Sequence, residues 1–370
     1  MKKCIEGSHA VAQIIKLCKP EVVSAYPITP QTHIVEDLAT MSANGEFDFE
    51  FIRADSEFAA ASIVLGSSAM GGRSYTATSS QGLMLMTEVV FSIAGMRKPV
   101  VLTCANRAIS SPINIWNDQQ DSMTVRDSGW IMLYAQDNQE AMDLHLFAFK
   151  LAEKLQLPAM VNMDGFILTH TYETVDLPSQ EQVDEFLPSY VAPEGTTLDT
   201  KNPVTLGSFA TPDDYHDIRM DLDADLRKAK ALFKKEAKLF KKIFKRDYKL
   251  IDYYGAKDPD TVFVSFGSLV GTIKDTVDSL IAQKKKVGVC NIVCYRPFPD
   301  EEVVKVLSKA KNIIVMEKDV SLGSGGALYG DLTRALYGNS KAKIFGNVVG
   351  LGGRDIRVED IQKKYKKIKK

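Results

Sequence analysis

The feature that most constrains the fold of this chain is an alternation of short apolar runs with helical patterns, which occurs twice. The first series occupies roughly residues 1–170, and the second begins at Thr261. Strand–helix alternation of this kind predicts parallel sheets with helices on both faces. We therefore expect an α/β protein with two doubly wound domains, of which the second is smaller. Ligands bind beyond the carboxyl ends of the strands in such sheets, so the residues that follow each strand are the first candidates for function.

The expected elements divide the chain into three parts. The first series predicts strands at 22–26, 49–52, 74–78, 100–104 and 159–162, and helices at 56–70, 81–96 and 138–155. The second predicts strands at 262–266, 286–293, 312–316 and 343–349, and helices at 271–283, 299–310 and 325–337. Residues 171–212 are rich in Pro, Gly, Thr and Asp and predict an irregular segment, whereas 213–250 has apolar residues at helical spacing. The domains that follow are 1–212, a helical linker at 213–254, and 255–370.

Composition excludes several classes of protein. The chain has 370 residues, of which 45% are apolar and 25% charged, as in ordinary globular proteins. No apolar stretch is long enough to span a membrane, and we expect no export signal behind Met1. The formal net charge of −1 gives no general attraction to nucleic acid. Lysines crowd the last ten residues, which is typical of a solvated helix face, with docking to an acidic partner as the alternative.

The 5 cysteines are an odd number at irregular spacing, so we expect free thiols and a reducing, cytoplasmic location. Cys290 and Cys294 lie in an apolar run and are expected to be buried. No spacing typical of an iron–sulfur cluster or of a zinc site occurs. We therefore expect no metal centre in this chain.

Three segments in the first series carry polar groups suited to catalysis. In the turn at 26–30, two prolines restrict the backbone and present the Thr29 hydroxyl, although Thr29 could instead cap the next helix. Glu57 opens a helix of small residues; it is either an ordinary first-turn acid or a carboxylate in an apolar pocket that exchanges a proton with a ring nitrogen. Residues 78–82, which include Gln81, either cap a helix or bind a polar or anionic group.

Arg107 follows the fourth expected strand, and its planar guanidinium suits a carboxylate ligand. A structural salt bridge to Asp118 or Asp121 is the alternative. In the second series, the glycines at 323–326 lack the full dinucleotide-binding spacing, so a tight turn is favoured there. The segment at 350–355 could contact a partner or simply turn the chain.

Taken together, these segments resemble the alpha subunits of the pyruvate:ferredoxin oxidoreductases, within the 2-oxoacid:ferredoxin oxidoreductase family. The resemblance runs along essentially the whole chain, in order. Its most specific motifs are YPITP (26–30), NIWND (114–118) and GLGGRD (350–355). The other matching segments are RADSEFAAA (53–61), TATSSQGLMLM (76–86), RDSGW (126–130), NQEA (138–141), GFILTHT (165–171), GSLVGT (267–272) and YRPFP (295–299).

The resemblance implies a thiamine diphosphate enzyme of several chains that converts pyruvate and coenzyme A to acetyl-CoA and CO2 and passes electrons to ferredoxin. This chain would supply the doubly wound pyrimidine-binding domain and a smaller α/β domain like the C-terminal domain of transketolase. By the match of motifs, Glu57 would be the catalytic carboxylate at the cofactor's pyrimidine, and Thr29 and Arg107 would contact the substrate. Pro27, Ile28 and Gln81 would line the cofactor site beside Glu57.

The chain lacks the diphosphate–magnesium motif of this cofactor class and the cluster cysteines. The resemblance therefore implies that Mg²⁺ and the [4Fe-4S] clusters lie on partner chains of the beta, gamma and delta types, and that this chain is inactive alone. Two alternatives stay open: an enzyme for 2-oxoisovalerate or another 2-oxoacid, and a non-catalytic scaffold subunit. Thr29 argues against a dianion such as oxalate, since similar oxalate enzymes carry a basic residue there. Subunit stoichiometry and the physiological direction stay open.

Overall fold

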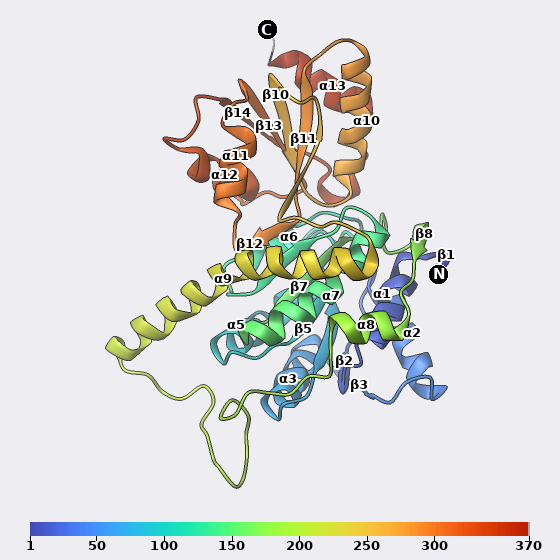
Figure 1. Ribbon diagram of the computed structural model, residues 1–370, viewed down its shortest axis with the longest axis vertical. Helices are drawn as coiled ribbons and strands as arrows, with labels where there is room; N and C mark the ends of the chain where they lie inside the picture. Colours follow the sequence, from blue (N-terminus) through green and yellow to red (C-terminus); the bar gives the residue numbers. More distant parts are fainter. Residues whose placement is uncertain (369–370) are drawn as a thin grey trace.

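The computed structural model describes residues 1–368, and Figure 1 shows two α/β units stacked along the long axis. The N-terminal unit is built on a seven-stranded sheet. Its strand order is β12 (Cys294–Arg296), β6 (Ile131–Tyr134), β7 (Ala159–Asp164), β5 (Val101–Asn106), β4 (Ser74–Thr78), β2 (Val22–Ala25) and β3 (Glu50–Arg53). All the strand pairs are parallel except that of β12 with β6. The parallel, doubly wound sheet expected from the sequence is confirmed.

Helices cover both faces of this sheet because side chains alternate in direction along each strand. On β5, Val101 joins the buried cluster of α1 (Gly7–Leu17), α2 (Thr32–Ala43) and α7 (Asn138–Leu155). Leu102 joins the cluster of α3 (Glu57–Ala69), α4 (Ser80–Leu85) and α5 (Thr87–Gly95) on the opposite face. The helix expected at 81–96 is thus two helices, which divide at Met86. The parallel strands end at one edge, where α6 (Gln120–Thr124) and the loops after β2, β4 and β5 lie.

The C-terminal unit has a five-stranded sheet and repeats the layered plan on a smaller scale. Its strand order is β14 (Lys343–Val348), β13 (Asn312–Glu317), β10 (Thr261–Ser265), β11 (Val287–Ile292) and β9 (Ile251–Gly255), of which β9 is antiparallel. One face packs against α10 (Leu269–Ala282) and α13 (Val358–Lys367). The other packs against α11 (Asp300–Leu307) and α12 (Ala327–Leu336), and a single 3-10 turn, η1 (Leu351–Gly353), follows β14. Lys369 and Lys370 of the lysine-rich end lie outside the described residues.

The segment expected to be irregular contains two regular elements, so that expectation is partly wrong. β8 (Tyr172–Asp176) pairs antiparallel with β1 (Lys2–Glu6), and α8 (Gln180–Phe186) follows it. A local pattern could not reveal β8, because its partner strand lies at the other end of the domain. The remaining stretch, 187–211, has neither helix nor strand, and its outer part forms the long loop at the bottom of Figure 1.

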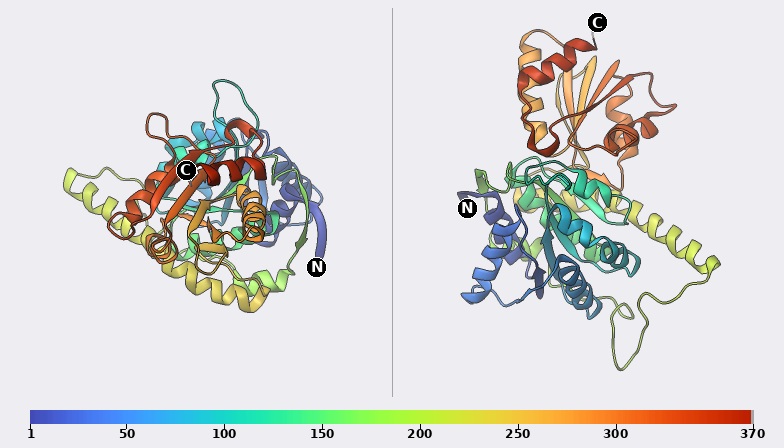
Figure 2. Two further views of the ribbon diagram at one scale, coloured as in Figure 1. Left: turned by 90° about the horizontal axis from the view of Figure 1, so that it is seen from above. Right: turned by 180° about the vertical axis from the view of Figure 1, so that it is seen from behind.

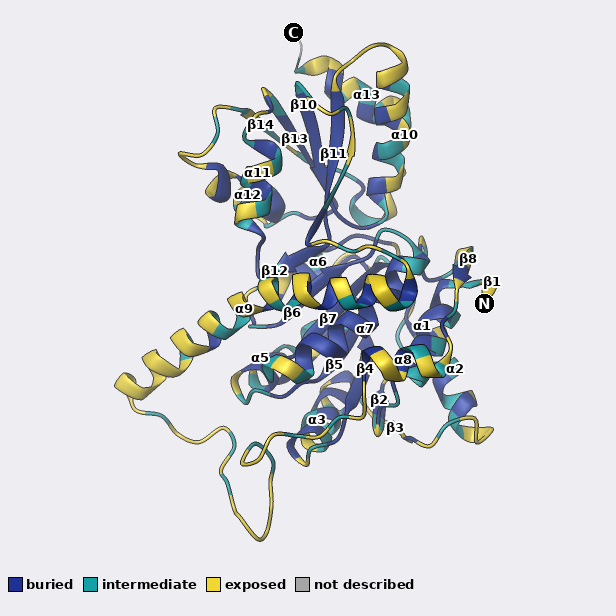
Figure 3. Ribbon diagram, viewed as in Figure 1, coloured by how far each residue is buried: buried dark blue, intermediate teal, exposed yellow. Residues whose placement is uncertain are grey.

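A single long helix, α9 (Pro212–Phe244), confirms the helical prediction for the middle of the chain. Thr211 caps its N-terminus by accepting a hydrogen bond from Asp214 N. Its second half packs on α7 and α8 through Phe233, Phe240 and Phe244. Its first turns project from the body, and Figure 3 shows them exposed. Figure 2, seen from behind, shows the same end standing free of both sheets.

The two units share one connection through the sheet itself. β12 follows β11 of the small sheet yet pairs with β6 of the large one. Cys290 and Cys294 on this segment are buried as expected, and all the cysteines are free thiols. Within residues 1–368, none of the helices combines the length and apolar character that a membrane crossing requires.

Candidate active site

Glu57 is the first residue of α3 and is only 7% exposed. Ser56 caps the helix by accepting a hydrogen bond from Ala59 N at 3.1 Å, so the cap does not need Glu57. Across the described chain, no group donates a hydrogen bond to the Glu57 carboxylate. The side chain is largely enclosed, but its two carboxylate oxygens are not among the fully buried atoms that lack a partner, so the carboxylate faces an opening.

Gly82 lets the start of α4 approach Glu57 closely. A Cβ at Gly82 would lie 2.8 Å from Glu57 Oε1 and 2.4 Å from Thr78 Oγ1, so a larger residue would displace one of them. Thr78 Oγ1 is itself buried and has no hydrogen-bond partner among the described residues. Two polar groups without partners therefore converge on one glycine at the end of β4. The sequence analysis included Thr78 in the candidate segment 78–82 but gave its hydroxyl no separate role.

Gln31, a fully buried residue that sequence reasoning missed, anchors the turn after β2 to the neighbouring strand β4. Gln31 Nε2 donates to Ala77 O on β4 at 2.7 Å, and its Oε1 accepts from the backbone of the turn. Gln31 is also the N-cap residue of α2, so the alternative in which Thr29 caps that helix is wrong. Within the turn, Pro27 and Ile28 are partly buried and Thr29 is exposed.

Arg107 reaches from the end of β5 to this turn. Its Nη1 donates to Thr29 O at 2.9 Å and its Nε donates to Asn114 O at 3.0 Å. Its guanidinium makes no ion pair with Asp118 or Asp121, so the salt-bridge alternative is wrong for the described chain. The second amino group, Nη2, has no hydrogen-bond partner in the described chain. Burial lowers the pKa of Arg107, although the nearby Asp121 carboxylate opposes this, and the group stays charged near neutral pH.

Asp121 joins the segments that carry these groups. Its carboxylate accepts hydrogen bonds from Arg107 N at 2.9 Å, Ser80 N at 3.0 Å and Asn106 Nδ2 at 2.9 Å. Burial raises the pKa of Asp121 to about 6, although these donors favour the charged form. The sequence had suggested Asp121 only as an ion partner for Arg107. It is instead the residue that fixes the backbones after β4 and β5 in one arrangement.

Gln81 holds the loop beyond Arg107. Its Nε2 donates to Ser110 O at 3.1 Å, and its Oε1 accepts from Ser110 N at 3.0 Å and from Ser80 Oγ at 2.6 Å. One N–H of this amide has no partner in the described chain, so Gln81 stays a candidate for a cofactor contact as well as a support for this loop.

The segment at 350–355 contacts this chain itself. Asn114 Nδ2 donates to Gly352 O at 3.1 Å, and Gly353 N donates to Asn117 O at 2.6 Å. A Cβ at Gly353, whose φ is +80°, would lie 2.5 Å from Trp116 Cβ. The C-terminal unit thus supports the loop that carries Asn114, and the close approach requires glycine.

A buried ion pair also joins the two units. Lys318 Nζ, after β13, lies 3.0 Å from Asp164 Oδ2, at the end of β7, and the two side chains are 5% and 1% exposed. Lys318 also donates to Asn117 Oδ1 at 2.8 Å, and Ser268 donates to Asp164 through both its N–H and its hydroxyl. Burial opposes ionisation of Asp164, but Lys318 and Ser268 hold its pKa below the usual value.

The glycine segment at 323–326 forms a turn with positive φ at Gly323 and Gly325, as the sequence favoured. The helix N-terminus that follows is already filled by the chain's own acids. Glu317 accepts from Leu328 N at 2.7 Å, and Asp319 accepts from Ala327 N at 3.1 Å. A phosphate group would have to displace both carboxylates, which disfavours a nucleotide site here.

The fold and these strand-end groups are those of an α/β enzyme that binds its ligands at the carboxyl edge of a parallel sheet. Two family models match the chain. One, described as pyruvate flavodoxin/ferredoxin oxidoreductase, thiamine diphosphate-binding, matches residues 13–238. The other, pyruvate:ferredoxin oxidoreductase core domain II, matches residues 259–361.

Curated relatives match along nearly the whole chain. The pyruvate synthase subunit PorA of Methanosarcina barkeri is 46% identical over 99% of this chain and 92% of that protein. The subunit of the same name from Pyrococcus furiosus is 45% identical over 96% of this chain and 90% of that protein. The ketoisovalerate oxidoreductase subunit VorA of Pyrococcus abyssi is 43% identical over 98% and 92%. The chain belongs to the pyruvate flavodoxin/ferredoxin oxidoreductase family, and its residues 13–238 match that family's thiamine diphosphate-binding domain.

A solved structure has the same fold. It is the 2-oxoglutarate:ferredoxin oxidoreductase from Magnetococcus marinus with 2-oxoglutarate, coenzyme A and succinyl-CoA bound, with a TM-score of 0.77 and 22% identity. The match covers 99% of this chain and 65% of that chain, so this chain spans about two thirds of its length. At this identity the likeness shows the fold alone.

Proposed function

We propose that this chain is the alpha subunit of a multi-chain pyruvate:ferredoxin oxidoreductase, which converts pyruvate and coenzyme A to acetyl-CoA and CO2 and passes electrons to ferredoxin. The observation that carries the proposal is Glu57, a residue only 7% exposed that packs against Gly82 and whose carboxylate has no partner in the described chain. A ring nitrogen of a bound cofactor would supply the missing partner. The family membership names the cofactor class, and the chain's own geometry is compatible with it.

The residues around Glu57 fit an aminopyrimidine ring. Glu57 offers a carboxylate, and Thr78 offers a buried hydroxyl without a partner beside the same glycine. When bound, thiamine diphosphate would supply the nucleophilic carbon that decarboxylation of a 2-oxoacid requires. The role of Glu57 is to hold and transfer a proton at a pyrimidine nitrogen, a task that requires a carboxyl group within hydrogen-bond reach. Pro27 and Ile28 would line the ring from the turn after β2.

Arg107 and Thr29 are the proposed substrate contacts. Nη2 of Arg107 is the donor that the protein leaves unused, and Thr29 is exposed beside it. A 2-oxoacid carries a carboxylate next to the reacting carbonyl, and a guanidinium binds carboxylates in a fixed orientation. Gln31 and Asp121 act as positioning residues, because they fix the turn and the arginine backbone.

Large exposed apolar side chains around the site support a shared active site. Ile113 is 84% exposed, Trp116 is 52% exposed and Leu85 is 52% exposed, all within segments that follow the strand ends. We take these three side chains as part of a surface that another chain covers. The proposed partners are beta, gamma and delta chains that bring the Mg²⁺–diphosphate site and the [4Fe-4S] clusters.

The test is to co-purify the complex and measure reduction of a one-electron acceptor by pyruvate, 2-oxoisovalerate and oxalate, with and without coenzyme A. We expect the highest kcat/KM with pyruvate and dependence on coenzyme A. A preference for 2-oxoisovalerate would support the alternative suggested by the relative named for that substrate. A complex that stays fully active with Glu57→Gln would leave only the scaffold alternative.

A second measurement addresses the shared site. The purified chain alone should bind thiamine diphosphate weakly and show no iron–sulfur absorbance. Submicromolar binding by the chain alone would contradict a diphosphate site on a partner chain.

A further inference from the structure

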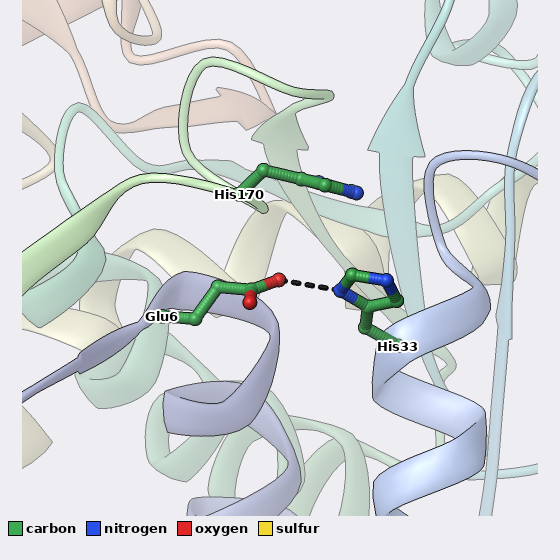
Figure 4. A group of neighbouring side chains, drawn as sticks. All are labelled: Glu6, His33 and His170. Carbon is green, nitrogen blue, oxygen red and sulfur yellow. Dashed lines mark hydrogen bonds and ion pairs between the residues drawn. The ribbon is translucent and has the colours of Figure 1, made fainter.

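Outside the site described above, two histidines and a carboxylate from three distant segments come together. Glu6 ends β1, His33 lies in the first turn of α2, and His170 lies in the loop between β7 and β8. One ligand atom from each lies within 4.8 Å of the others. Figure 4 shows the three side chains facing one another, with the hydrogen bond between Glu6 and His33. Sequence reasoning expected no metal centre in this chain and did not single out these residues, because metal motifs are recognised by short spacings and these three are far apart.

We propose that Glu6, His33 and His170 form a binding site for a divalent transition cation of the zinc class. Two imidazoles and one carboxylate are a ligand set that zinc uses when it keeps a fourth position for water. Two of the three residues, Glu6 and His33, line a surface hollow of about 370 Å³ together with His9, Glu36 and Asp37, so an ion and its water can approach from that side.

The arrangement of the two rings suits ligation. The ring centroids of His33 and His170 are 4.6 Å apart. Nδ1 of His170 is 2.7 Å from Thr169 Oγ1, which leaves Nε2 as its ligand atom. Metal-bound histidines are commonly oriented by such a hydrogen bond through the other nitrogen. His33 Nδ1 lies 2.6 Å from Glu6 Oε1, and a cation would take the place of the proton shared by these two atoms.

The neighbouring His9 is not part of the proposed ligand set. Its Nδ1 is 3.0 Å from Asp37 Oδ2 and its Nε2 is 3.2 Å from Gln13 Nε2, so both ring nitrogens are engaged. It therefore provides a control within the same hollow.

Occupation of the site would brace the turn that precedes α2. His33 is four residues beyond Thr29, and the His170 ring packs on Phe166 at 4.7 Å, which in turn packs on Trp116 at 4.8 Å. A cation that ties β1, α2 and the loop after β7 together would stabilise the full chain without taking part in its chemistry. The proposal does not depend on the proposed function.

The experiment measures Zn²⁺ binding to the metal-free full chain by equilibrium dialysis with metal analysis. It uses a Cys4→Ser background, because Cys4 is an exposed thiol that could bind zinc by itself. We expect about one ion per chain, and a loss of affinity of at least about tenfold in His33→Asn, His170→Asn and Glu6→Gln. His9→Asn and His216→Asn, the latter on the projecting part of α9, should bind as the background chain does.

A background chain that binds no zinc would overturn the proposal, and so would a loss in His9→Asn equal to that in His33→Asn. Should a variant fail to fold, the unmodified ligand set can be examined with Co²⁺. An absorption spectrum of cobalt with nitrogen and oxygen ligands, displaced by Zn²⁺, supports the site, and its absence refutes it. Thermal unfolding with and without Zn²⁺ gives a further readout: the melting temperature should rise in the background chain and stay constant in His33→Asn.

Discussion

The strand ends of the two sheets carry similar polar groups but use them differently. In the large sheet, the Glu57 carboxylate and Nη2 of Arg107 have no partner within the described chain. In the small sheet, Glu317 and Asp319 accept backbone N–H groups of α12, and Lys318 pairs with Asp164. We call the strand-end edge of the large sheet the open edge, because these polar groups have no partner within the described chain. The strand-end edge of the small sheet is the closed edge, because contacts within the chain satisfy its polar groups.

The difference suggests that the edge of the large sheet is a binding site and that the edge of the small sheet has a structural role. A small doubly wound unit can keep the geometry of a ligand-binding fold while its own acids fill the position that a ligand would take. Gly326 illustrates this, because a Cβ there would lie 1.8 Å from Glu317 Oε1. The small unit instead holds the loop at 114–118 through Gly352 and Gly353. Substitutions at the open edge should change turnover, and substitutions at the closed edge should change stability.

The largest expected effect is that of Glu57→Gln at the open edge. The amide keeps the shape of the side chain but cannot exchange the proton, so turnover of the assembled complex should fall about 10²–10⁴-fold. The melting temperature of the chain should change little, because no hydrogen bond within the chain is lost. Steady-state kinetics together with thermal unfolding check both parts. Turnover near that of the wild type would remove Glu57 from the chemistry.

Lys318→Met should have the largest effect at the junction. It leaves Asp164 buried without its cation, and breaking a buried pair in this way costs about 3–5 kcal/mol. The matched control is Lys311→Met, which removes an exposed pair with Asp260 and should cost about 0–1 kcal/mol. The free energy of unfolding from urea titration measures both. Equal effects for the two variants would show that the junction does not depend on this pair.

The closed edge should also give a pH dependence. Burial raises the pKa of Glu317 to about 7, whereas an unfolded glutamate has a pKa of about 4.3. Between these values the folded state binds more protons than the unfolded state, so stability falls as the pH rises toward 7 and is constant above it. The full effect on the free energy of unfolding is on the order of 4 kcal/mol. Glu317→Gln should flatten this fall between pH 5 and pH 8, measured by denaturant titration at several pH values; parallel curves would contradict the prediction.

The sequence predicted the fold class because its strand and helix patterns are local. The helix at Glu57, the long α9 and both parallel sheets follow from patterns within single segments. The pairing of β8 with β1, the crossing of β12 into the large sheet, and the roles of Gln31 and Asp121 depend on contacts between distant segments. No spacing rule reveals such contacts. Asp121 shows the limit most clearly, because its residue type suggested an ion pair. In the fold, its carboxylate accepts hydrogen bonds from two backbone N–H groups and one side-chain amide around the site.

Arg107→Lys is expected to have an intermediate effect. Lysine keeps the charge but loses the planar group that donates to Thr29 O and Asn114 O while leaving Nη2 for a ligand. The KM for pyruvate should rise by about ten- to a hundredfold, the range of a hydrogen bond to a charged group, and kcat should change less. Steady-state kinetics of the complex check this split. Unchanged pyruvate kinetics would remove Arg107 from the substrate site.

Thr29→Ala should give the smallest effect at the open edge. The Thr29 hydroxyl is exposed in a turn that Gln31 fixes independently, so its removal should leave the turn in place. A neutral hydrogen bond contributes about 0.5–1.5 kcal/mol, which corresponds to a rise in KM of about two- to tenfold. Thr29→Ser keeps the hydroxyl and should restore most of the affinity. Thr29→Arg adds a second cation beside Arg107, so it should weaken the use of pyruvate and favour a dianion. Kinetics with pyruvate and oxalate on the three variants test the assignment. A threefold or larger rise in KM for Thr29→Ser, equal to that of Thr29→Ala, would show that the methyl group rather than the hydroxyl matters.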